Sequence, residues 1–227
     1  MFRMILITMS LFLIPFAGPV TAADLAPVES LGRALFFDPQ LSNPPGQSCA
    51  SCHDPAVGWT GPDPALNATG AVMEGAVHTR YGNRKPPSSA YAGFNPALHC
   101  VMSGAGPGGG GMGSGGMGGG MGNGGMGTGG ICEGKFAGGM FWDGRATGWT
   151  LGDPLAEQAM GPFQNPLEMN SPNQKLVCLK VRESVYAGLF EEIWGANSLD
   201  CVKDVGTTYE RIAQAIAAYE RSTEVNP

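Results

Sequence analysis

The sequence has few positive charges and no run of them. Its 13 Lys and Arg residues stand against 19 Asp and Glu residues in a chain of 227. A protein that follows a phosphate backbone needs clustered Lys and Arg side chains, so we expect no nucleic-acid partner. Beyond residue 23 the chain also lacks an apolar run long enough to cross about 30 Å of hydrocarbon. We therefore expect no membrane span after that point.

The first 23 residues have the pattern of a secretory signal peptide. Arg3 supplies a positive start, residues 5–16 are mostly apolar, and small residues at 20–23 offer a cleavage site. A membrane anchor is the alternative, but two polar residues, a proline and a glycine interrupt the stretch. We expect a signal peptide at 1–23, a single mature domain at 24–227, and a location in a bacterial periplasm.

The chain contains one C-x-x-C pattern, Cys49-Ala50-Ser51-Cys52, and His53 follows it directly. Two thiols at this spacing can add to the two vinyl groups of one porphyrin, and the next imidazole can bind the iron. A redox pair or half of a zinc site is the alternative, but no second C-x-x-C exists to complete a zinc tetrahedron. The motif predicts one covalent haem c, with His53 as the proximal iron ligand.

The four other cysteines are an even number, which in an oxidising compartment favours two disulfides. Four cysteines allow three pairings, and the sequence does not choose among them. We favour Cys100 with Cys132, which would close the base of the loop between them. Cys178 with Cys201 would then join two predicted helical stretches.

Residues 103–130 are nearly all glycine, interrupted by methionines. Glycine contributes no side-chain burial and loses the most backbone entropy on ordering, so we interpret the segment as a long Gly/Met-rich loop insertion. A copper(I) site is the alternative, because thioethers are soft ligands and four of them recur at nearly even spacing: Met112, Met117, Met121 and Met126.

Outside this insertion the hydrophobic periodicity is helical, and we expect an all-α fold without strands. The predicted helices cover 30–37, 176–194 and 207–221, and the first of them is stopped by Asp38-Pro39. In the last helix the charged residues, Glu220 among them, lie mostly off the apolar stripe. The stripes are Leu31, Ala34 and Leu35; Val177, Val181, Val185, Leu189 and Ile193; and Ile212, Ala213, Ile216 and Tyr219.

Six short segments occur in a characteristic order: 31–39 (LGRALFFDP), 49–53 (CASCH), 82–88 (GNRKPPS), 141–145 (FWDGR), 158–162 (QAMGP) and 168–169 (EM). In this order they resemble the N-terminal haem domain of the bacterial di-haem cytochrome c peroxidase family, which includes MauG-like enzymes. The resemblance runs from about residue 29 to 222, apart from the glycine insertion. It implies a cytochrome c-like all-α haem domain.

Members of this family have two such domains, a peroxide-reacting haem in the first and an electron-entry haem in the second. This chain corresponds to the first, and the second haem domain is absent from it. Its final residues, 222–227, are similar to the start of an interdomain linker. We therefore expect the chain to be part of a longer protein, with a natural single-haem chain as the alternative.

The resemblance also assigns residues to the reaction. Glu168 matches the catalytic glutamate of the family, and a carboxyl in a largely apolar pocket can have a raised pKa. Gln158 matches a glutamine of the same distal pocket. His78 lies where related peroxidases carry a sixth iron ligand, with His99 as the competitor. Without a distal ligand, a MauG-like enzyme would fit better.

Three further residues are interpreted through the same motifs. Trp142 matches a tryptophan between the two haems and would relay electrons; packing as ordinary core is the alternative. Asp143 and Arg145 are expected to pair with each other or with a haem propionate. Asn83 would contribute to a calcium site at the junction with the second domain.

The predicted function is reduction of hydrogen peroxide to water in the periplasm. The expected partners are hydrogen peroxide, a small electron-donor protein such as a cytochrome c or a cupredoxin, and a second copy of the chain in a homodimer. An acidic surface would steer a basic donor toward the haem. The alternatives are a mono-haem electron carrier without catalysis and MauG-like oxidation of a partner protein.

Overall fold

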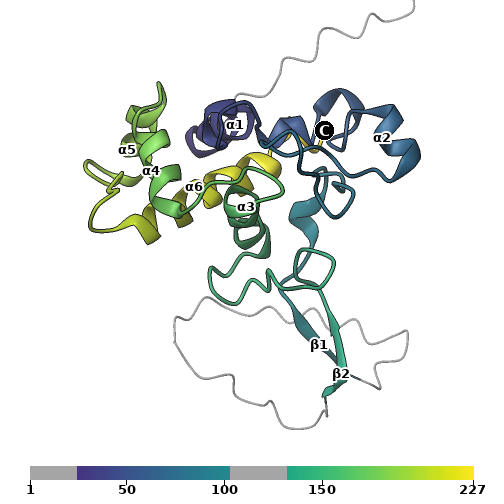
Figure 1. Cartoon of the computed structure of the whole chain (residues 1–227). Helices are drawn as coiled ribbons and strands as arrows, with labels where there is room; N and C mark the ends of the chain where they lie inside the picture. Colours follow the sequence, from purple (N-terminus) through teal and green to yellow (C-terminus); the bar gives the residue numbers. More distant parts are fainter. Residues whose placement is uncertain (1–24, 103–131) are drawn as a thin grey trace, which may run out of the picture.

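The computed structural model describes residues 25–102 and 132–227 (Figure 1). The predicted signal peptide and the Gly/Met-rich insertion lie outside the described residues. The described part is mostly helical, as the sequence predicts, and none of its helices is both long and apolar enough to cross a membrane. In chain order the helices are α1 (Pro27–Phe37), α2 (Pro64–Thr69), α3 (Pro154–Gln164), α4 (Gln174–Arg182), α5 (Ala187–Trp194) and α6 (Val205–Glu220).

The core forms where α1 crosses α6, and α3 packs against the other side of α6 (Figure 1). At the crossing Gly32 is buried against the backbone of α6. A Cβ at that position would lie 1.9 Å from the Ala215 carbonyl oxygen and 2.8 Å from Cβ of Tyr219. Only a glycine lets the two backbones approach this closely, so Gly32 fixes the geometry of the crossing.

Local signals set the ends of these helices. Pro27 occupies the first turn of α1, where its missing N–H costs nothing, and the Glu29 carboxylate accepts a hydrogen bond from the Ala26 N–H. Asp153 caps α3 by accepting from the Leu155 N–H at 2.9 Å. The predicted stripe of α6 is confirmed, because Ile212, Ala213, Ile216 and Tyr219 are all buried.

The predicted single helix over 176–194 is wrong: the structure has two helices, α4 and α5, separated by residues 183–186. The Ser184 hydroxyl donates to the Val181 carbonyl at 2.7 Å, and such local bonds compete with helix continuation. Val185, expected on the buried stripe, is fully exposed. Tyr186 is held instead by a hydrogen bond from its hydroxyl to Asp38.

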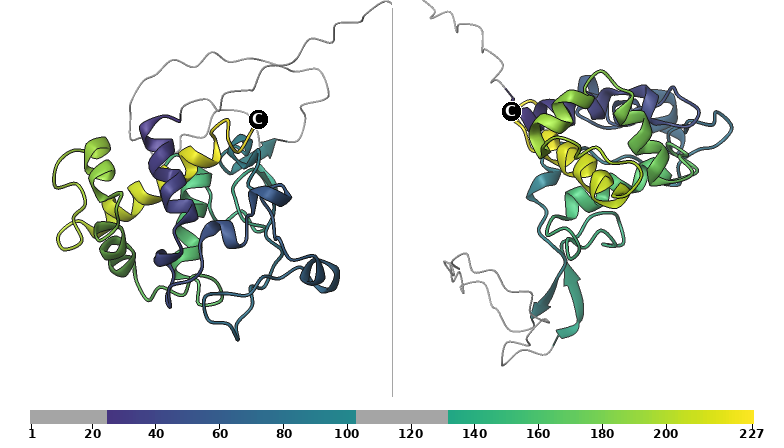
Figure 2. Two further views of the ribbon diagram at one scale, coloured as in Figure 1. Left: turned by 90° about the horizontal axis from the view of Figure 1, so that it is seen from above. Right: turned by 90° about the vertical axis from the view of Figure 1, so that its left-hand side faces the viewer.

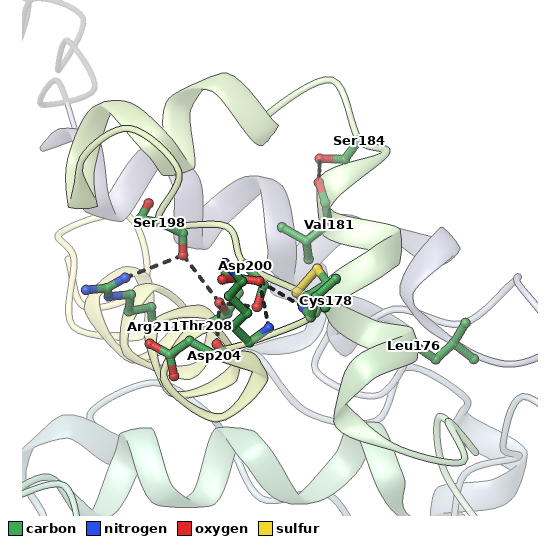
Figure 3. The surroundings of a disulfide bond; sticks show 12 residues. Leu176, Cys178, Val181, Ser184, Ser198, Asp200, Asp204, Thr208 and Arg211 are labelled. Atoms are coloured by element: carbon green, nitrogen blue, oxygen red, sulfur yellow. Dashed lines mark hydrogen bonds between the residues drawn. A yellow bond between two sulfur atoms is a disulfide. The ribbon is translucent and has the colours of Figure 1, made fainter.

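The predicted disulfide between Cys178 and Cys201 is confirmed, and it ties α4 to the loop before α6 rather than to another helix. Figure 3 shows this region, in which the Thr208 hydroxyl contacts the carbonyls of Ser198, Asp200 and Asp204. The loop is therefore anchored covalently to α4 and by polar contacts to the first turn of α6. Cys100 is disulfide-bonded as well, but the side chain of Cys132 lies outside the described residues, and this pairing stays a prediction.

The expectation of no strands is wrong. Strands β1 (His99–Met102) and β2 (Cys132–Ala137) pair antiparallel as a ribbon that extends away from the helices (Figures 1 and 2). Cys100 pairs with Phe136 and His99 with Ala137. The two strands are separated by the whole insertion, so their pairing is a non-local contact that short sequence windows do not reveal.

The crossing at Gly32 generates a stability prediction. Replacing Gly32 by Ala should lower the free energy of unfolding by about 3 kcal/mol or more, because the added methyl meets a backbone carbonyl that cannot move alone. Gly206→Ala, in the first turn of α6 with open space around it, is the matched control and should be neutral or slightly stabilising. Denaturant unfolding measures both variants; equal stability of Gly32→Ala and the unmodified protein would contradict the role given to the crossing.

Candidate haem site

The C-x-x-C-H motif folds into a tight turn at the edge of a cavity. The one-turn 3-10 helix η2 (Cys49–Ser51) begins the turn, and the backbone N–H groups of Cys52 and His53 both donate to the Cys49 carbonyl, at 3.1 and 2.9 Å. Both cysteines are free thiols that line the cavity together with His53. The turn therefore presents the three predicted haem-binding side chains to one space.

His53 is oriented by the backbone of Trp59. Its Nδ1 lies 3.2 Å from the Trp59 carbonyl oxygen, and because a carbonyl can only accept, the proton sits on Nδ1. The other ring nitrogen, Nε2, is then the one that could bind a metal. The Pro87 carbonyl is a second hydrogen-bond partner of this ring. Burial lowers the pKa of His53 below its usual value, which keeps the imidazole in the neutral form that binds iron.

The predicted distal residues face the same cavity. Gln158 comes from α3, and Glu168 from the turn that follows this helix. Burial raises the pKa of the Glu168 carboxyl, while a hydrogen bond with Asn165 and the positive charge of Arg145 oppose the rise. The structure thus brings Gln158 and Glu168 together with the haem motif, from segments far apart in the sequence.

The turn that carries Glu168 is supported by residues 75–76. The Ala76 N–H donates to the Glu168 carbonyl at 2.8 Å, and a Cβ on Gly75 would lie 2.3 Å from the Leu167 carbonyl oxygen. Within the turn the Glu168 N–H donates to the Asn165 carbonyl at 3.0 Å. The Glu168 backbone is therefore held on both sides.

Trp142 lines the cavity and is 69% exposed, so it is not part of the protein's own core. Its packing on a haem and its role as an electron relay both stay predictions. The Arg84 guanidinium lies 3.9 Å from the centre of its ring. Arg145 forms a two-pronged ion pair with Asp143 at 2.8 and 3.0 Å, which agrees with the expected pairing of these two residues. Asn83 also lines the cavity, and its calcium role stays a prediction.

The structure does not bring His78 to the cavity. Its side chain is 86% exposed, and its Nδ1 lies 3.2 Å from the Glu74 carboxylate. His99 is exposed on β1, where its Nδ1 contacts the Ala97 carbonyl. Neither histidine is a cavity residue in this conformation, so iron ligation by His78 would need the segment that carries it to turn inward.

Sequence reasoning missed two buried polar residues of the cavity, Gln47 and Glu220. The Gln47 amide donates to the Glu74 carbonyl at 2.8 Å. Glu220, expected off the apolar stripe, is only 6% exposed and faces the cavity. The signal was present, because Glu220 lies one helical turn after the buried Ile216 and therefore shares its face.

The cavity has a volume of about 700 Å³, within the range of cofactor sites. Its lining comes from α1, the C-x-x-C-H turn, the loop 82–89, the FWDGR segment, α3 and α6. Within the described ranges, no three His, Cys, Asp or Glu side chains cluster as metal ligands would. Two free thiols beside a neutral imidazole instead fit a covalently attached haem, whose iron needs one protein ligand on that side.

Comparison with known proteins also points to a haem protein. The family model described as di-haem cytochrome c peroxidase matches residues 27–226. The methylamine utilization protein MauG of Paracoccus denitrificans is 34% identical over 95% of this chain and 46% of its own length. The cytochrome c551 peroxidase of Nitrosomonas europaea is 27% identical over 88% of this chain and 40% of its own length.

The crystal structure of the dihaem peroxidase BthA from Burkholderia thailandensis superposes with a TM-score of 0.65 at 27% identity, over 91% of this chain and 43% of that one. The chain thus spans about half the length of the curated relatives it matches over most of its own length. The family model covers all the residues that line the cavity, and the chain belongs to the di-haem cytochrome c peroxidase family.

Proposed function

We propose that this chain is the peroxide-reacting haem domain of a periplasmic enzyme that reduces hydrogen peroxide to water. One observation carries the proposal: Glu168 and Gln158 face the same cavity as Cys49, Cys52 and His53. A base, a polar orienting group and an iron-binding histidine then surround one space, as peroxide heterolysis requires. Membership of the peroxidase family supports this assignment.

Cys49 and Cys52 would hold the haem through two thioether bonds, and His53 would bind its iron through Nε2. When bound, the haem supplies an iron that binds peroxide and exchanges electrons with it. The hydrogen bond from His53 Nδ1 to the Trp59 carbonyl fixes the plane of the imidazole and makes it a stronger electron donor to the metal.

Glu168 would take the proton from the peroxide oxygen nearer the iron and return it to the departing oxygen. This double role needs a carboxyl whose pKa is closer to neutrality than that of a solvated glutamate, and burial moves the Glu168 pKa in that direction. The Gln158 amide would orient the peroxide by hydrogen bonding. In the complete reaction hydrogen peroxide takes up two electrons and two protons and leaves as two waters.

Electrons would enter from a small donor protein through a second haem, with Trp142 as the relay. The support is its position, because the indole lines the cavity and also reaches the surface. Asn83, in the same cavity wall, would contribute to calcium binding at the junction with a second domain. The signal peptide, the periplasmic location and a homodimer belong to this proposal as well.

A second candidate function is MauG-like oxidation of a partner protein. Two observations favour it: the 34% identity to a MauG protein and the exposure of His78, which leaves the distal side of the cavity without a histidine. A MauG-like protein would consume peroxide slowly without a small donor and would change a partner protein covalently. Mass spectrometry of a candidate partner after peroxide treatment distinguishes the two functions.

Replacing Glu168 by Gln should lower peroxide turnover by about 10²- to 10⁴-fold, because the amide cannot accept the peroxide proton. The haem absorption spectrum should stay unchanged, since Glu168 does not hold the haem. Glu210→Gln, on α6 but outside the cavity lining, is the control and should keep full turnover. Stopped-flow peroxide kinetics measure all three proteins; unchanged turnover in Glu168→Gln would remove the proposed role, and no turnover in any of the three would favour an electron carrier.

The pH profile tests the surroundings of Glu168. Because the base form is needed, activity should fall as the pH drops through the raised pKa of Glu168. Arg145→Gln removes the positive charge that holds this pKa down, so the acid limb of kcat/KM should move to higher pH, by up to about one unit. Arg211→Gln loses the same charge near the Cys178–Cys201 disulfide, outside the cavity lining (Figure 3). It should not move the limb, and an equal shift in both variants would point to a net-charge effect instead.

A further inference from the structure

Glu220 is a buried carboxyl that the proposed peroxide chemistry does not use. It lies at the end of α6, is 6% exposed, and faces the haem cavity. Its Oε2 has no hydrogen-bond partner among the described residues. A buried polar atom without a partner is costly, and such atoms in native proteins usually have a functional reason.

The groups around Glu220 do not include a cation dedicated to it. Among the described residues, Arg221 is the cation whose charge favours ionisation of Glu220, but its guanidinium forms a two-pronged pair with Asp153 at 2.6 and 2.8 Å. The Asp153 carboxylate, at the start of α3, opposes ionisation of Glu220, while Arg221 and a hydrogen bond from the buried Ser89 favour it. From η2 the facing group is Cys49, whose thiol would become a neutral thioether on haem attachment.

The remaining cavity wall adds little compensation. Helix α1 contributes Phe36 to this wall, which carries no charge. The other ionisable residues of the cavity lining are Cys52, His53, Glu74, Arg84, Lys85, Arg145 and Glu168. None of them is among the groups that shift the pKa of Glu220, which are Ser89, Arg221 and Asp153. Burial in these surroundings raises the pKa of Glu220 to about 7. The carboxyl is therefore balanced between its two protonation states near neutral pH.

We propose that Glu220 is the proton acceptor coupled to reduction of the haem iron in this cavity. On reduction the iron gains one electron from an external reductant, and the Glu220 carboxylate gains one proton from solvent, forming an O–H bond while no bond breaks. The physical cause is Coulombic. Iron loses one unit of positive charge on reduction, and a carboxylate in the same low-dielectric cavity then holds a proton more tightly.

In this proposal Glu220 adjusts the charge of the cavity and does not take part in the reaction with peroxide. Protonation cancels the charge that the electron brings into the cavity, which makes reduction easier below neutral pH than above it. A proton taken up here is also stored close to where peroxide reduction would consume protons. The inference rests on the haem attachment of the proposed function, but not on peroxide turnover.

The test is the midpoint potential of the haem-loaded chain between pH 5 and 9, measured by spectroelectrochemistry. In the unmodified protein the potential should fall with rising pH around neutrality. The limit is about 59 mV for each tenfold drop in proton concentration, the value for one proton per electron. Glu220→Gln should flatten this slope and keep the higher potential of the protonated state. A slope equal to that of the unmodified protein would overturn the inference.

Two further variants keep the test decisive. Glu168→Gln changes the other buried carboxyl of the cavity and should retain the slope; loss of the slope there, with retention in Glu220→Gln, would assign the proton to Glu168. Ser89→Ala removes the hydrogen bond that favours the ionised carboxylate, so the sloping range should move to higher pH. If Glu220→Gln does not fold, Ser89→Ala still tests the inference. It is overturned if the midpoint potential of Ser89→Ala changes over the same pH range as that of the unmodified protein.

Failure of the proposed function gives a different result. A chain that attaches no haem shows no haem absorption band, and a haem that is reducible but inert to peroxide leaves the potential measurement intact. Infrared difference spectra between the reduced and oxidised states supply a readout independent of potential. A protonated carboxyl band should appear on reduction and be absent from Glu220→Gln; the same band in both proteins would place the proton elsewhere.

Discussion

The close crossing of α1 and α6 is the constraint on which the rest of the structure depends. Gly32 lies against the Ala215 carbonyl because neither helix has a side chain between them. One turn further along α1, Phe36 then faces the cavity, and Ile216 and Glu220 do so from α6. A larger residue at position 32 would separate the helices and move all three side chains. The position of this part of the cavity wall therefore depends on the lack of a side chain at Gly32.

Both sides of the cavity are held mainly by backbone contacts. The imidazole of His53 is fixed by the Trp59 carbonyl, and the turn that carries Glu168 is fixed by the Gly75–Ala76 segment. Backbone partners do not titrate, so His53 and the turn that carries Glu168 keep their orientation when the pH changes. The acid–base behaviour of the site is then set by burial and by a few charges, chiefly Arg145 for Glu168.

The sequence predictions that failed share a physical cause. The break between α4 and α5 depends on the Ser184 hydroxyl and on Tyr186 reaching Asp38, and the β1–β2 ribbon pairs residues on either side of the insertion. Burial of Glu220 depends on α1 and α3 packing against α6 from either side. Apart from the local bond of Ser184, these are contacts between distant segments, which the periodicity and propensity of a short sequence window do not reveal.

The sequence by itself determined the C-x-x-C-H motif at 49–53, the mainly helical fold and nearly the extent of α6, and its resemblance to a family pointed to Glu168 and Gln158, which line the same cavity as the motif. Each of these depends on the spacing of residues within a short segment or on the order of such segments along the chain, which can be read without the folded structure. Only the tertiary structure decided that His78 points to solvent and that Glu220 is buried with an unpartnered oxygen. The exposed fraction of a side chain and the pKa of a carboxyl depend on all the groups around them, and only the folded chain brings those groups together.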